Sequence, residues 1–160
     1  MKITDTMVLF WNGIYSNWEP SKFFWNGMEF NCGEQYMMYR KAEIFGDERI
    51  AKLVMEAKLP GHQKALGREV CDFDPDYWSS VCVDVMVEGL TCKFKQNPTM
   101  KEELLATGDR IIAEASPVDK IWGIGLNEND PRALLPSLWL GQNLLGITLM
   151  KVRDILKNDI

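Results

Sequence analysis

The stretch that decides the fold is "GEQYMMYRKAEIF", residues 33–45. We expect it to form a helix, in which Glu34 and Lys41, seven residues apart, come to the same face after two turns. The residues between them, Met37 and Met38 among them, are expected to be buried. Burying charge is costly unless the charge is paired or used. The question is therefore what a carboxylate and an amine do beside a core.

Outward from this helix, the sequence favours further helices and few strands. We expect helices over about 47–57, 60–69, 74–97, 97–108 and 142–157, a strand over 110–116, and an irregular insertion over 126–141. The phrase "FWNG" occurs at 10–13 and at 24–27, and Asn-Gly suits the positive φ angles of a tight turn, so a hairpin-like turn is expected at each. The pattern predicts an α+β fold, mostly helical with a small β-sheet. A length of 160 residues suits a single domain over 1–160.

Composition narrows the class of protein. The chain is 46% hydrophobic and 26% charged, as in globular proteins. Its first residues do not have the pattern of a signal peptide, and no apolar run is long enough to span a membrane, so we expect neither a leader nor a membrane partner. The net charge of −5 argues against a broad nucleic-acid surface, although a local Arg or Lys cluster could hold a small phosphorylated ligand.

Cysteine and histidine usage bears on metal binding and location. The four cysteines include no CxxC pair, and His62 is the only histidine in the sequence. We therefore predict no metal site and no cofactor. Several cysteines fall in apolar helical patterns and are expected to be buried free thiols, which favours the reducing cytoplasm.

Two ionisable residues carry the functional interpretation. Taken alone, Glu34 has an ordinary structural role, because a carboxylate in the first turn interacts favourably with the helix dipole. Taken alone, Lys41 has one too, because its aliphatic stem can lie along the core while its ammonium stays in water. Together with Met37 and Met38 they make a mixed apolar and ionisable face, which is typical of a lined pocket.

Other candidates have structural alternatives. Arg68 in "ALGRE" is either a solvated residue at a helix end or a bidentate ligand for a phosphate or carboxylate. Trp122, beside Gly123 in "DKIWGIG", is either a core plug or a wall on which a base stacks. Three more candidates lie in turns or near a helix start, where bonds to backbone or caps are the ordinary role: Tyr15, Asn17 and Asn143.

Seven phrases, taken in order, carry a family resemblance: "YSNWEPSKF", "GEQYMMYRK", "ALGRE", "VMVEGLTCKFKQNP", "LLATGD", "AEASPVDKIWGIG" and "LGQNLLGITLMKVR". This series closely resembles the NADAR family, which includes the riboflavin biosynthesis intermediates N-glycosidases. The resemblance covers about residues 8–156. It implies hydrolysis of a bond between ribose C1 and an exocyclic nitrogen, either in a ribosylaminopyrimidine phosphate or in guanine that carries ADP-ribose.

The resemblance also implies roles for particular residues. Lys41 matches the helical lysine of the family and Glu34 its acid, with Asp119 as a third catalytic candidate. Lys41 would capture an opened glycosylamine as a Schiff base, or Glu34 would activate water directly; the sequence leaves both routes open. The implied substrate-binding residues are Tyr15, Asn17, Arg68, Trp122, Gly123 and Asn143.

Two departures from the family pattern concern the substrate. Gln35 stands where many members have His after the acid, and the loop between Gly125 and Gly141 is longer and less glycine-rich. The expected partner is a small phosphorylated ribosyl substrate, with ADP-ribosylated guanine in nucleic acid as the other possibility. A non-catalytic module that binds ADP-ribose or a nucleotide, and a helical interaction domain, are the alternatives. The sequence gives no indication of the oligomeric state.

Overall fold

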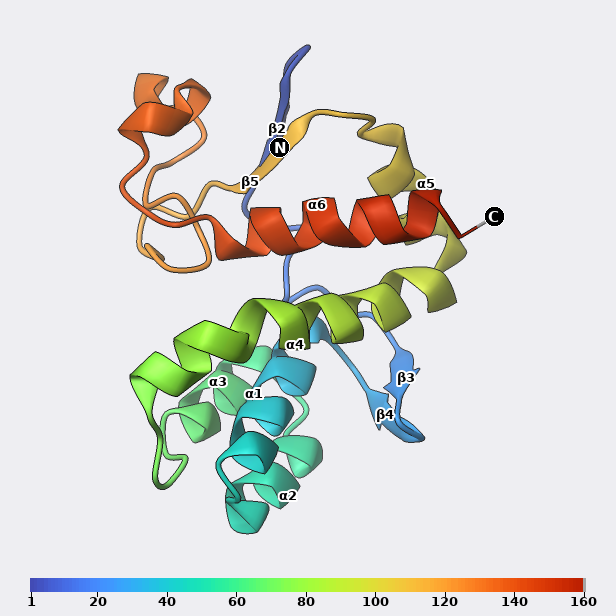
Figure 1. The fold of residues 1–160 in the computed structure, drawn as a ribbon, viewed down its shortest axis with the longest axis vertical. Coiled ribbons are helices and arrows are strands. Elements are labelled where there is room, and N and C mark those ends of the chain that lie inside the picture. Colours follow the sequence, from blue (N-terminus) through green and yellow to red (C-terminus); the bar gives the residue numbers. More distant parts are fainter. Residues whose placement is uncertain (160) are drawn as a thin grey trace. The chain divides into compact units, whose positions relative to one another are not determined.

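The computed structural model describes residues 1–159, which form six α-helices, five strands and two short 3-10 helices. The predicted α+β class is confirmed, with helices predominant and the strands in small sheets (Figure 1). The chain falls into two compact units, one made of Met1–Ser16 together with the residues from Pro98 onward, the other of Asn17–Asn97. The single domain expected from the sequence stays a prediction. No helix among residues 1–159 combines the length and the apolar character needed to cross a membrane.

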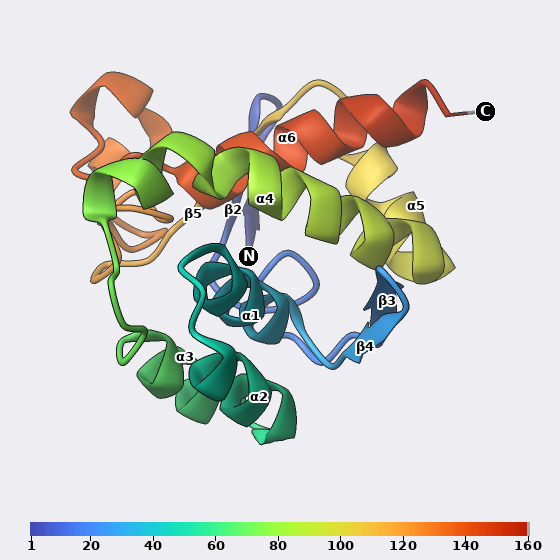
Figure 2. The same ribbon diagram turned by 60° about the horizontal axis from the view of Figure 1, so that its bottom comes forward.

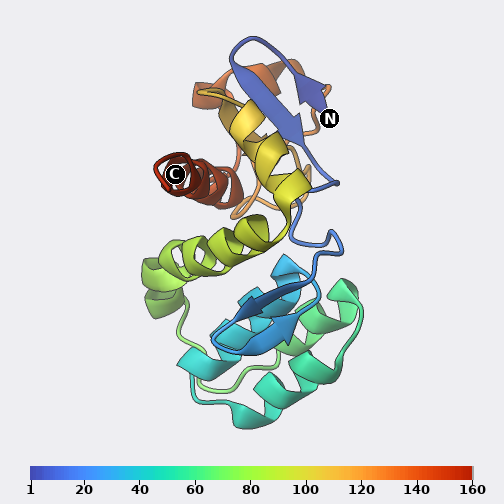
Figure 3. The same ribbon diagram turned by 90° about the vertical axis from the view of Figure 1, so that its right-hand side faces the viewer.

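The first unit is built on a three-stranded sheet with the order β1-β2-β5. Strand β1 (Lys2–Ile3) pairs antiparallel with β2 (Met7–Phe10), and these are the two dark blue arrows in Figure 3. Strand β2 pairs in parallel with β5 (Ile111–Glu114). All four residues of β2 are buried, as expected for a central strand that is covered on both faces.

Two helices complete this unit. Helix α6 (Leu144–Lys157) packs on β5, and α5 (Pro98–Ala106) packs on α6. The long connection between β5 and α6 contains η1 (Pro131–Leu134) and η2 (Pro136–Leu138), in the part of the chain where an irregular insertion was expected. Buried side chains of β2, β5 and this connection form one core cluster: Met7, Leu9, Ala113, Ala115, Ile124, Leu126 and Ala133.

The second unit contains four helices: α1 (Gly33–Ile44), α2 (Glu48–Glu56), α3 (Pro60–Gly67) and α4 (Pro75–Gln96). Helices α2 and α3 pack against each other and against α1 (Figure 2). Asp47 caps α2 by accepting from Ile50 N–H, and Asp74 caps α4 by accepting from two backbone N–H groups. These local signals explain why both helix starts were predictable.

A two-stranded hairpin lies beside these helices. Strands β3 (Phe23–Trp25) and β4 (Met28–Phe30) pair antiparallel around Asn26-Gly27, whose φ angles are 52° and 77°. The hairpin predicted for the second "FWNG" is therefore confirmed. The hairpin predicted for the first, at 10–13, is wrong, because β2 ends there and its neighbours in the sheet are β1 and β5.

Candidate active site

Helix α1 carries both ionisable residues that the sequence singled out. Glu34 is only 4% exposed and lies in the first turn, where backbone N–H groups and the helix dipole favour a negative charge. Its own backbone N–H donates to the carbonyl oxygen of Asn17 at 2.8 Å. Lys41 lies in the last turn of the same helix and is half-buried.

The charges around Lys41 explain its titration. Burial lowers the pKa of the Lys41 ammonium, the Glu34 carboxylate opposes that shift, and the Arg68 guanidinium adds to it. Within this unit the structure thus brings both Glu34 and Arg68 within electrostatic reach of Lys41. Arg68 is exposed at the C-terminal end of α3, so its guanidinium is accessible to an anionic ligand.

Asn17 adds an unusual polar atom next to Glu34. Its side chain is 6% exposed and packs against Gly33, the residue before Glu34. Within the described residues, the Oδ1 atom of Asn17 is buried and makes no hydrogen bond. A buried acceptor without a donor is costly, so such an atom calls for an explanation, and a donor on a bound ligand is one.

Aromatic side chains lie beside Lys41, and the sequence reasoning missed two of them, Phe73 and Tyr77. The Lys41 ammonium lies 4.3 Å from the centroid of the Phe73 ring. Phe45 lies near-perpendicular to both Phe73 and Tyr77, with centroid separations of 5.2 Å and 6.1 Å. The signal that could have found them is the stretch "DFDPDYW", in which two aromatic residues alternate with acidic ones at a helix start.

Asp119 and Gly123 shape a loop of the first unit. Asp119 Oδ1 accepts from the backbone N–H groups of Ile121 and Trp122, both at 2.9 Å. Gly123 is buried, and a Cβ there would come within 2.8 Å of the Asp119 carbonyl oxygen. The carbonyl oxygen of the half-buried Trp122 accepts from Leu145 N–H at 3.0 Å. This loop therefore also provides a hydrogen-bond acceptor for a backbone N–H group in the first turn of α6.

Asn143 and Tyr15 make structural contacts in the same unit. Asn143 has a left-handed φ of 55° and makes no side-chain cap bond; instead, its amide donates to Ile112 C=O and accepts from Glu114 N–H, which ties α6 to β5. The Tyr15 hydroxyl donates to Glu103 C=O at 3.1 Å, and burial raises its pKa to about 12.

The nine predicted residues are thus divided between the two units. Asn17, Glu34, Lys41 and Arg68 belong to the unit of residues 17–97; Tyr15, Asp119, Trp122, Gly123 and Asn143 belong to the other. That both sets line one pocket stays a prediction. Among residues 1–159, no three His, Cys, Asp or Glu side chains are grouped as metal ligands.

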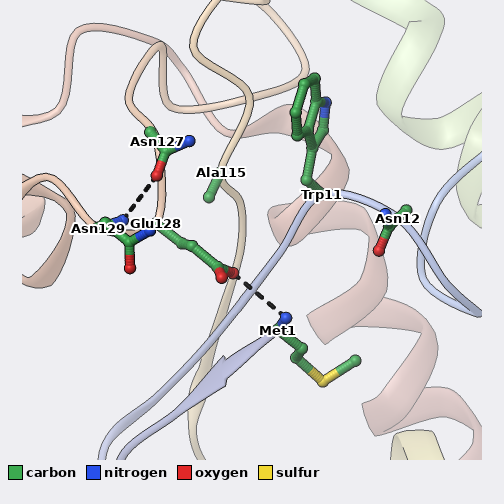
Figure 4. A pocket seen from close by; sticks show the side chains of 7 residues that line it. All are labelled: Met1, Trp11, Asn12, Ala115, Asn127, Glu128 and Asn129. Carbon is green, nitrogen blue, oxygen red and sulfur yellow. Dashed lines mark hydrogen bonds and ion pairs between the residues drawn. The ribbon is translucent and has the colours of Figure 1, made fainter.

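The first unit also holds a small cavity of about 160 Å³, drawn in Figure 4. Its lining side chains are Met1, Trp11, Asn12, Ala115, Asn127, Glu128 and Asn129, and none of the predicted site residues is among them. The Met1 ammonium pairs with Glu128 at 3.3 Å across it. Ligand pockets usually measure ~300–1,000 Å³, so this cavity is too small for a whole nucleotide.

Comparison of the sequence and of the fold with known proteins identifies the family of this chain. The NADAR domain model matches residues 9–157. An N-glycosidase of Acanthamoeba polyphaga mimivirus is 44% identical over 146 residues, which cover 88% of this chain and 86% of the relative. A riboflavin biosynthesis protein of Vibrio vulnificus is 30% identical over 146 residues, 91% of this chain but 36% of that protein. The NMR structure of the E. coli protein YbiA superposes with a TM-score of 0.80 at 26% identity and covers 99% of this chain and 89% of that one. The resemblance seen in the sequence is therefore confirmed, and the chain belongs to the NADAR family.

Proposed function

We propose that the protein hydrolyses the N-glycosidic bond between ribose C1 and an exocyclic amine of a nucleotide-like substrate. The observation that carries the proposal is the state of Lys41: a half-buried lysine, with its pKa lowered, in reach of the buried Glu34 carboxylate. A lysine in water is almost fully protonated at pH 7 and is a poor nucleophile. Burial makes the neutral amine more available, as a nucleophilic lysine requires.

In the covalent route, the ribosylated amine first opens to an imine at C1. The Glu34 carboxylate takes a proton from the Lys41 ammonium, the resulting neutral amine adds to C1, and the exocyclic amine of the base leaves with the proton that Glu34 gives back. The product is a Schiff base between Lys41 and the sugar. Water then adds to C1, with Glu34 accepting its proton, and the C1–N bond to Lys41 breaks to release the free sugar. The proton that Lys41 gives up in the first half returns to it from water, through Glu34, in the second.

The direct route uses the same two groups differently. Glu34 activates water or stabilises an oxocarbenium-like transition state, and the Lys41 ammonium contributes positioning charge. The cation–π contact with Phe73, at 4.3 Å, favours the charged form of Lys41 and is the feature that speaks for this route.

The substrate class follows from the charges and from the relatives. Arg68 is accessible for a bidentate contact to a phosphate, which both a ribosylaminopyrimidine phosphate and ADP-ribose carry. The names of the relatives, N-glycosidase and riboflavin biosynthesis protein, support the reaction and the first of these substrates. The net charge of −5 favours a small molecule or a single exposed nucleotide over a long nucleic acid.

The experiment offers the protein three compounds in separate reactions: a ribosylaminopyrimidine phosphate, DNA with ADP-ribosylated guanine, and free ADP-ribose. Mass spectrometry then identifies the released base and sugar. Turnover of either of the first two supports the proposal and assigns the substrate. Binding of any of the three compounds, with no turnover of either of the first two, would contradict it and favour a non-catalytic binding module.

The Lys41→Arg variant separates the two routes. Arginine keeps the positive charge but cannot form the imine, so we expect normal folding and a loss of turnover of roughly 10³-fold or more. Borohydride added during turnover should trap the sugar on Lys41 in the wild type. Lys52→Arg, on the exposed face of α2, is the matched control and should keep full activity. An active Lys41→Arg enzyme would rule out the covalent route.

A further inference from the structure

Phe45, Phe73 and Tyr77 form a cluster beside Lys41, which we call the aromatic wall. Phe45 follows α1 directly, Phe73 lies in the turn before α4, and Tyr77 lies in the first turn of α4. Phe73 is 38% exposed and Tyr77 52% exposed. Two large aromatic rings therefore remain accessible at the place where the proposed nucleophile emerges from α1.

Backbone contacts hold the wall in place. One carboxylate oxygen of Asp47 caps α2, and the other accepts from Cys71 N–H at 2.9 Å, two residues before Phe73. Asp72 has a left-handed φ of 57°, a conformation that Asp tolerates in tight turns. Asp74 then caps α4. The wall is thus built into a braced turn, which reduces the entropy that a ligand must overcome in ordering it.

We infer that the aromatic wall binds the planar base of the substrate by stacking, and that Phe73 is a specificity-determining residue that selects substrates with a planar base over those without one. The inference rests on the proposed function, since it takes Lys41 as the group that attacks C1. Every nucleobase and aminopyrimidine has a π-face that stacks on an aromatic side chain. With the Lys41 ammonium 4.3 Å from the Phe73 centroid, a base on this ring would hold its exocyclic nitrogen beside the lysine.

Stacking of a base would also change the protonation equilibrium of the Lys41 amine. A base that takes the place of the ammonium over Phe73 removes a cation–π contact that favours the charged amine. The flexible four-carbon stem of lysine lets the amine move aside. Binding of a planar base would therefore make the neutral amine more available where it is needed, whereas a substrate without a planar base would leave Lys41 over Phe73.

The test measures binding of two probes by titration calorimetry: guanosine 5′-monophosphate, which has a base, and ribose 5-phosphate, which has none. For Phe73→Ala we expect the dissociation constant of guanosine 5′-monophosphate to rise by about 5- to 150-fold, the range of base–aromatic stacking. That of ribose 5-phosphate should not change. Phe73→Tyr should restore binding, and Phe73→Leu, which keeps apolar volume without a ring, should not.

Phe24→Ala is the matched control. Phe24 is 47% exposed, belongs to the same unit, and also has a lysine near its ring, with Lys22 Nζ 5.7 Å from the centroid, yet it is not part of the wall. This variant should bind both probes like the wild type. In turnover, Phe73→Ala should raise KM for a base-bearing substrate with little change in kcat, which a merely structural role would not produce.

The outcomes are decisive in both directions. The inference is overturned if the wild type does not bind guanosine 5′-monophosphate, if Phe73→Ala weakens both probes equally, or if Phe73→Leu binds the base as well as Phe73→Tyr does. Failure of the proposed function looks different. If the wild type turns over no ribosylated amine, the proposed hydrolase function is refuted. If Phe73→Ala still loses base binding in that case, the inference that the aromatic wall binds the base is kept.

Discussion

Lys93, in α4, is a charged residue with no exposed surface. Burial lowers the pKa of its ammonium from the ordinary value of 10.5 to about 8, although the Glu19 carboxylate opposes the shift. The ring of Phe94 lies 5.1 Å from the Lys93 Nζ atom. A lysine kept in the core at this cost makes the stability of the fold depend on pH, and replacing it should remove that dependence.

The magnitude follows from the pKa. The pKa of Lys93 falls from 10.5 to about 8 on folding, and each pKa unit corresponds to ~1.4 kcal/mol, so the charged form costs the folded state about 3 kcal/mol. Between these two values the unfolded chain binds more protons than the folded one, so stability rises with pH. The cost is fully present below pH ~8 and is gone above pH ~10.5.

The perturbation is Lys93→Met, which keeps an unbranched chain of similar length and removes the charge. The assay is urea unfolding of wild type and variant at pH 7 and pH 10. We expect the difference in unfolding free energy, variant minus wild type, to fall by roughly 2–3 kcal/mol between these pH values. Lys52→Met, at an exposed site, should show a constant difference. A difference for Lys93→Met that stays constant or grows with pH would refute the reasoning.

Further predictions concern catalysis and one structural contact. Because the reactive form of Lys41 is neutral and its pKa is lowered, kcat/KM should rise with pH and then level off below the pKa of a free lysine; a pH-independent profile would contradict the covalent route. Since the residues of the site offer no cluster of metal ligands, activity should be unchanged in chelator; a loss that a divalent ion reverses would count against this. Asn143→Ala should lower the unfolding free energy by roughly 2–3 kcal/mol in denaturant titration, because its bonds to Ile112 and Glu114 are lost, whereas Gln142→Ala should have little effect.

The helices were predictable because their signals are local. Asp47 and Asp74 accept from the first N–H groups of their helices, and Pro75 suits the first helical position. The hairpin predicted for the first "FWNG", at 10–13, was wrong because these four residues make a hairpin only where apolar strands flank them on both sides. Residues 23–30 meet that condition. At 10–13 the parallel partner of β2 is β5, about a hundred residues away, and no local pattern announces such a pairing.

The candidate site was predictable only in part for a related reason. The spacing of Glu34 and Lys41 places them on one helix, and the family motifs lead to Arg68. The exposure of Phe73 depends on how the turn before α4 is braced by Asp47, which tertiary packing decides. In "TCKFKQ" the sequence alone does not distinguish Lys93 from Lys95, although one is fully buried and the other exposed.

Helix α1 is held on two sides through glycine, and this explains how a mostly helical unit can position two charges. A Cβ at Gly89 of α4 would overlap the Tyr36 ring, and a Cβ at Gly67 of α3 would overlap the Met38 side chain. Both neighbouring helices thus approach α1 more closely than any larger residue would allow. Tyr36 and Met38 lie between Glu34 and Lys41, so the contacts that fix them also fix the separation of the carboxylate and the amine. Catalysis by two groups depends on such a fixed separation, since a misplacement of about 1 Å can cost ~100-fold in rate. The tight packing of α1 is therefore as much a part of the proposed site as the two ionisable residues that it positions.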